Sequence, residues 1–136
     1  MNIDANLDIL VFLRDNTFQT GSMAYGLPNP KDHDRFCVNS TLELLKEKLK
    51  SYDVGIRTGG KSGGTSHAII FTIDGIDYNV FAVQHDEIEI IKAVTEMVRV
   101  ALKHMPLSAQ QKPYWVHLFR TTRDTLTLWK TKGNTP

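Results

Sequence analysis

Two apolar segments on either side of Asp74-Gly75 constrain the fold of this chain most strongly. Residues 68–73 and 76–83 are rich in β-branched and aromatic side chains, as strands are. An Asp-Gly pair between two such segments favours the tight turn that joins antiparallel strands. We therefore predict a β-hairpin over residues 68–83.

The remainder of the chain alternates between amphipathic segments and short extended ones. Apolar residues recur at helical spacing in four segments, and short apolar runs bounded by turn residues separate them. This order predicts an α+β fold, in which helices pack on a mixed β-sheet, within a single domain of residues 1–136. Helices are expected over 4–15, 41–52 (with Ser40 as the cap), 86–104 and 114–130, and further strands over 16–20, 34–38 and 54–57.

Composition narrows the class of protein. A chain of 136 residues is the size of one ordinary domain. It lacks the roughly 18–20 consecutive apolar residues of a membrane span and the pattern of a signal peptide. Cys37 is the only cysteine, which excludes an internal disulfide. We therefore expect a cytoplasmic protein with no membrane partner.

Charge is distributed unevenly along the chain. Residues 1–90 hold 8 Lys and Arg against 13 Asp and Glu, whereas residues 91–136 hold 8 basic and 2 acidic residues. Such segregation is compatible with carboxylates for a metal ion beside cations for phosphate. From charge alone, however, an uneven but solvated surface is the favoured interpretation.

Gly21-Ser22 is the first candidate for ligand binding. It follows the predicted strand 16–20, and Ser22 is expected to cap a single helical turn that ends at Gly26. Such a turn offers free N–H groups and a hydroxyl to a phosphate oxygen.

Asp32 and Asp34 are the second candidate. In a strand, residues two apart project to the same face, so these carboxylates repel each other unless a divalent cation lies between them. A third carboxylate is expected from a neighbouring strand. Asp77 is the best candidate because it interrupts an apolar strand, where a charge without a partner is costly.

These motifs together resemble the nucleotidyltransferase superfamily related to DNA polymerase beta, and most closely its small stand-alone members. The resemblance covers roughly residues 5–85, the predicted motif core, and leaves a C-terminal helical part over about 86–131. It implies transfer of a nucleoside monophosphate from an NTP to a hydroxyl of a protein or RNA acceptor, with pyrophosphate released. Small members often act in toxin–antitoxin systems, where they modify a partner protein or tRNA.

The resemblance also implies a role for each motif residue. Gly21 and Ser22 would hold the triphosphate. Asp32 and Asp34 would bind two Mg²⁺ ions, and Asp77 would share one of them and help to deprotonate the acceptor. Two such ions stabilise both the attacking and the leaving oxygen.

Residues around the aspartates depart from the family's usual pattern. Lys31, His33 and Arg35 stand where the family usually has Ser and apolar residues. Lys31 and Arg35 are cations that would neutralise the carboxylates without a metal ion. This favours an alternative function, a catalytically silent domain that binds a protein or RNA through its basic C-terminal third.

The glycine-rich segment 58–64 carries the remaining candidates. Residues 55–62 match the phosphate-loop pattern of NTPases, but neither a buried strand before them nor a helix after them is predicted. A P-loop NTPase is therefore the weaker alternative. Arg57 and Lys61 are instead expected to lie near the triphosphate and to stabilise the leaving pyrophosphate.

Overall fold

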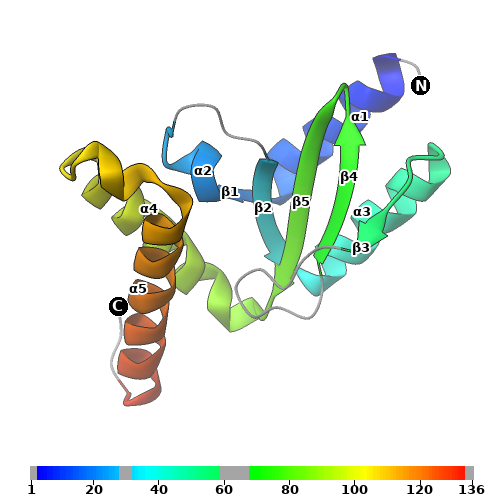
Figure 1. The fold of residues 1–136 in the computed structure, drawn as a ribbon. Helices are drawn as coiled ribbons and strands as arrows, with labels where there is room; N and C mark the ends of the chain where they lie inside the picture. The colour runs from blue at the N-terminus through cyan, green and yellow to red at the C-terminus, as the bar shows by residue number, and fades with distance from the viewer. Residues whose placement is uncertain (1–2, 28–31, 59–67, 134–136) are drawn as a thin grey trace.

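The computed structural model describes residues 3–27, 32–58 and 68–133 (Figure 1). It confirms the α+β class and the mixed sheet with helices packed on it. The elements in chain order are α1 (Ile3–Asn16), β1 (Phe18–Thr20), α2 (Gly21–Ala24), β2 (Asp32–Val38), α3 (Asn39–Ser51), β3 (Arg57–Thr58), β4 (Ala68–Ile73), β5 (Ile76–Val83), the 3-10 turn η2 (His85–Glu87), α4 (Ile88–Lys103), the 3-10 turn η3 (Leu107–Gln110) and α5 (Lys112–Thr131).

The sheet has five strands in the order β1-β2-β5-β4-β3. β4 and β5 form the predicted hairpin, and Asp74 and Gly75 at its turn have φ values of 51° and 78°, as the tight turn requires. β2 and β5 are parallel, and every other pair is antiparallel. Parallel neighbours need a crossover connection, and α3 lies within the one that joins β2 to β5.

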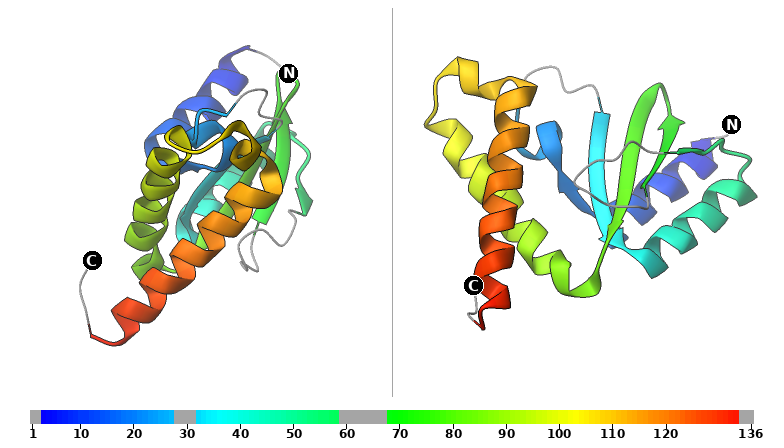
Figure 2. Two further views of the ribbon diagram at one scale, coloured as in Figure 1. Left: turned by 60° about the vertical axis from the view of Figure 1, so that its left-hand side comes forward. Right: turned by 60° about the horizontal axis from the view of Figure 1, so that its bottom comes forward.

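One face of the sheet is covered by α1 and α3, which lie side by side in Figure 1 and in the right-hand view of Figure 2. Leu42, Leu45 and Leu49 recur at helical spacing on α3 and are fully buried. They pack in one cluster with Phe71 and Val80 of the hairpin. This cluster is the main core of the protein.

The opposite face is covered only in part. Helices α4 and α5 pack against each other on this side (Figure 1). Ile91 of α4 closes a small cluster with Phe36, Phe81 and Val83, which lie in the C-terminal halves of β2 and β5. The N-terminal halves of the same two strands hold Asp32 and Asp77, both of which lie outside this cluster.

Several predicted boundaries are wrong by a few residues. α3 begins at Asn39, and its first turn receives no side-chain cap, so Ser40 is not the cap that we predicted. Asn16 ends α1 instead of starting a strand. The extended segment expected over 54–57 forms only the two-residue strand β3. Within the described residues, no helix combines the length and the apolar character needed to span a bilayer.

Candidate functional site

The parallel pairing of β2 with β5 brings the predicted acidic residues to one corner of the sheet. Asp32 is the register partner of Asp77, and Asp34 is the partner of Asn79. Register partners on neighbouring strands lie roughly 4.8 Å apart and point to the same face, and residues two apart share that face. One face of the sheet therefore carries Asp32, Asp34 and Asp77. It is the face that α4 and α5 cover only in part.

Gly21 lies directly against Asp34. A Cβ atom added to Gly21 would come within 2.3 Å of Asp34 Oδ2, and the φ angle of Gly21 is +71°. Both the close approach and the left-handed backbone exclude a side chain at this position. The structure thus places the Gly-Ser motif beside the Asp-x-Asp motif, as the sequence predicts.

Ser22 is an internal residue of the short helix α2 and does not cap it. The helix begins at Gly21, two residues before the start that a Ser22 cap would give, and Gly21 itself has a positive φ that turns the chain directly out of β1. Thr20 is the cap position, but its hydroxyl pairs with the hydroxyl of Thr95 on α4 at 2.9 Å. Our prediction of a Ser22 cap is therefore wrong. Gly26, with φ of +69°, follows the end of this turn as predicted.

Asp34 is a carboxylate in an unfavourable environment. Burial raises its pKa to about 6, and the nearby charge of Asp32 contributes in the same direction. A hydrogen bond from Asn79 and the positive charge of Lys112, at the start of α5, only partly offset this rise. A bound divalent cation would favour the ionised carboxylate and remove this cost.

Asn79 has a side-chain oxygen without a partner at the same corner of the sheet. Its Oδ1 is buried and has no hydrogen-bond partner among the described residues. Asp32, Asp34 and Asn79 together offer carboxylate and amide oxygens, which are the donors that Mg²⁺ takes in proteins. The chemical types of these side chains are therefore compatible with a Mg²⁺ ion.

Asp77 is held by residues of the neighbouring strands. Thr72 of β4 donates a hydrogen bond of 2.6 Å to Asp77 Oδ1, and Nη2 of Arg57 on β3 lies 3.3 Å from the same oxygen. The Thr72 hydrogen bond, with the charge of Arg57, holds the pKa of Asp77 below its usual value. In the described part of the chain, no three His, Cys, Asp or Glu side chains lie close enough together to hold a metal ion. The backbone thus aligns the three aspartates, whereas side-chain contacts direct Asp77 toward β4 and β3.

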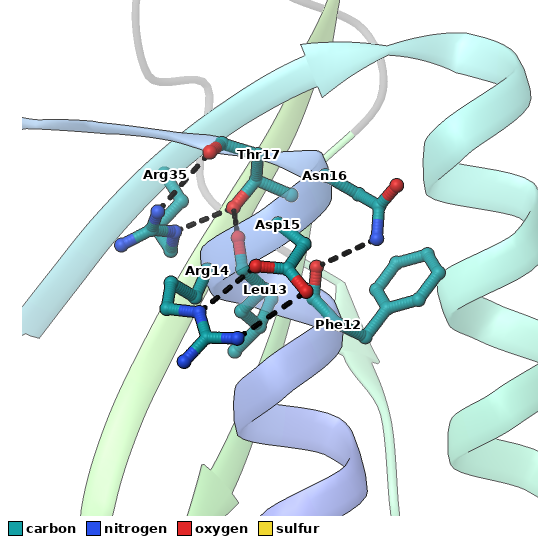
Figure 3. A network of polar contacts seen from close by, with 7 residues as sticks. All are labelled: Phe12, Leu13, Arg14, Asp15, Asn16, Thr17 and Arg35. Carbon is teal, nitrogen blue, oxygen red and sulfur yellow. Dashed lines mark hydrogen bonds and ion pairs between the residues drawn. The ribbon is translucent and has the colours of Figure 1, made fainter.

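Arg35 does not neutralise the aspartates. It alternates to the opposite face of β2, where its guanidinium donates to the hydroxyl of Thr17 and, at 3.1 Å, to the Thr17 carbonyl (Figure 3). The predicted role of Arg35 as an internal counter-ion is therefore wrong. Lys31 and Lys61, the other cations predicted near the carboxylates or the triphosphate, lie outside the described residues.

Three residues near this corner were not predicted. Asn79 shares the face of Asp77 by strand alternation, and Thr72 faces Asp77 across a hairpin whose register follows from its turn, so both were accessible to sequence reasoning. Lys112 carries no such signal, because its approach to Asp34 depends on how α5 packs.

Comparison with protein-family models, with curated proteins and with solved structures found no match to this chain. A function for the protein must therefore be argued from the geometry of this corner.

Proposed function

We propose that this chain is a Mg²⁺-dependent nucleotidyltransferase that transfers a nucleoside monophosphate from an NTP to a hydroxyl of a protein or RNA acceptor. The observation that carries the proposal is the parallel register that sets Asp32 beside Asp77, with Gly21 packed on Asp34. Nucleotidyl transfer needs closely spaced carboxylates beside backbone N–H groups that can bind the phosphates of the NTP.

The residues at this corner have distinct roles in the proposed reaction. Asp32 and Asp34 would hold Mg²⁺, and Asp77 would share one ion. When bound, Mg²⁺ would neutralise charge on the phosphate oxygens and lower the pKa of the attacking hydroxyl. Backbone N–H groups near Gly21 and Ser22 would contact the triphosphate, and Arg57 would balance the charge of the leaving pyrophosphate.

The proposed chemistry is a single displacement at the α-phosphorus. The acceptor oxygen forms a new bond to phosphorus while the bond to pyrophosphate breaks. The proton of the acceptor hydroxyl would pass to the carboxylate of Asp77 and from there to solvent.

A second candidate function is supported by the position of Asp77. Its engagement by Thr72 and Arg57 is also what a catalytically silent domain would show, with the basic C-terminal third left to bind a protein or RNA. Such a domain would bind its partner without Mg²⁺ and without an NTP.

Label transfer from an NTP distinguishes these functions. The full chain is incubated with lysate acceptors and each of four NTPs carrying ³²P at the α-phosphate. We expect Mg²⁺-dependent label on an acceptor, no label from a γ-labelled NTP, and loss of label in Asp32→Asn and Asp34→Asn. Asp124→Asn, an exposed acidic position on α5, is the matched control and should retain activity. Absence of label with all four NTPs would contradict the proposal.

A further inference from the structure

Arg57 and Asp77 make one contact that conflicts with the separate roles proposed for them. Arg57 Nη2 lies 3.3 Å from Asp77 Oδ1, so in this arrangement that oxygen is engaged on the β4 and β3 side, away from β2, and part of the guanidinium is already used. Each residue can take up its proposed role fully only when the other releases it. The structure therefore couples the third carboxylate of the site to whatever binds Arg57.

We propose that Arg57 and Thr72 are positioning residues that withhold Asp77 from the metal site until the triphosphate of the NTP draws Arg57 away. The inference rests on the proposed function and deepens it, since it makes completion of the metal site depend on the nucleotide.

The geometry supports an exchange of partners at Arg57. Thr72 and Asp77 are register partners on adjacent strands, and Arg57 reaches both of them, at 3.2 Å from Thr72 Oγ1. The side chains of Arg57 and Asp77 remain 59% and 43% exposed, so water screens their attraction and the ion pair is weak. A triphosphate carries more negative charge than one carboxylate and accepts two parallel hydrogen bonds from a guanidinium.

The position of Asp77 after release follows from the backbone. Asp77 is already the register partner of Asp32, so a rotation about its side-chain bonds is enough to bring the carboxylate toward Asp32. No strand has to move. The exchange is therefore compatible with the paired β-sheet.

Mn²⁺ binding to the full chain without nucleotide, measured from the EPR signal of free Mn²⁺, tests the first half of the inference. Thr72→Val removes the hydroxyl without changing charge, and Arg57→Gln removes the ion pair. Each change should tighten Mn²⁺ binding by about two- to fivefold, the range for an exposed pair. Thr72→Ser keeps the hydroxyl and should behave as the wild type.

The same substitutions made in the Asp77→Asn variant separate the release of Asp77 from a general effect of charge on Mn²⁺ binding. In Asp77→Asn there is no carboxylate to release, so adding Thr72→Val or Arg57→Gln should leave Mn²⁺ affinity unchanged. Tightening that persists in this background, or that is absent in the wild-type background, overturns the inference but not the proposed function. If neither the wild type nor either variant binds Mn²⁺ in a manner that Asp34→Asn abolishes, the proposed function fails as well.

Tripolyphosphate, which carries the phosphates of an NTP without its base, tests the reciprocal half in buffer that contains EDTA. Asp77→Asn frees Arg57, so calorimetry should show tighter binding by about two- to fivefold, and this gain should disappear when Arg57→Gln is also present. An equal gain with and without Arg57 would show that Asp77 does not compete for it, and would overturn the coupling.

Discussion

Replacement of Asp34 by Asn should stabilise the protein at neutral pH. The folded state raises the pKa of Asp34 from 3.8 to about 6, chiefly through burial. Each pKa unit corresponds to 1.36 kcal/mol, so the ionised carboxylate lowers the free energy of unfolding at pH 7 by at most about 3 kcal/mol. Asn has the same shape and no charge, and its side-chain oxygen can still accept the hydrogen bond from Asn79.

The size of this effect depends on pH. Below about pH 3 the carboxyl group is mostly protonated in both the folded and the unfolded states, so the wild type and Asp34→Asn should unfold at nearly the same denaturant concentration. As pH rises toward 6, the unfolded chain ionises first, and the wild type loses stability relative to the variant. At pH 7 the difference should reach its full value, or roughly 10 °C in the thermal midpoint.

Urea unfolding at about pH 3 and at pH 7, with and without Mg²⁺, measures both effects. Mg²⁺ should raise the midpoint of the wild type at pH 7 and leave that of Asp34→Asn unchanged, because the proposed site needs the Asp34 carboxylate. Without Mg²⁺, Asp32→Asn is the matched control, since Asp32 is exposed on the same strand and its removal should change stability by at most about 0.5 kcal/mol. If Asp34→Asn is no more stable than the wild type at pH 7, the reasoning from burial is refuted.

Three further substitutions test other parts of the structure by urea unfolding. Gly21→Ala should lower the free energy of unfolding by about 1–3 kcal/mol and abolish Mn²⁺ binding, because φ is +71° and Asp34 lies where the new Cβ would be. Gly55→Ala, with open space around it, should change neither quantity, and equal losses at both glycines would contradict this. Arg35→Met should lower the free energy of unfolding by about 1–3 kcal/mol, because it removes the hydrogen bonds to Thr17, and should keep wild-type Mn²⁺ affinity. A changed affinity would place Arg35 at the metal site after all. Phe36→Ala should lower the free energy of unfolding by about 3–5 kcal/mol because Phe36 is fully buried, and a loss below 1 kcal/mol would show that its cluster is not a packed core.

Local patterns predicted the elements of this fold well. The Asp74-Gly75 turn specified the hairpin and its register, and helical spacing identified four of the helices. The parallel pairing of β2 with β5 has no local signal, because it depends on a crossover through α3. Asp77 was chosen as the third carboxylate because it interrupts an apolar strand, and the family resemblance implied the same residue.

The errors at the site have identifiable physical causes. A Gly-Ser pair is compatible with a serine cap, but Gly21, with its positive φ, is already the first residue of the helix, two residues before a Ser22 cap would start it. Arg57 lies on a two-residue strand with no detectable pattern, so its contact with Asp77 was not foreseeable. For Arg35, strand alternation alone would have placed it on the face opposite Asp34.

A crystal structure of the chain with Mg²⁺ and an NTP analogue that resists cleavage between the α- and β-phosphates tests the central claim most directly. We predict a metal ion in contact with both Asp32 and Asp34, Asp77 turned toward them, and Arg57 on the phosphates beside Gly21. A nucleotide bound elsewhere, or a metal ion that contacts neither Asp32 nor Asp34, would contradict the claim that this corner of the sheet is a nucleotidyl-transfer site.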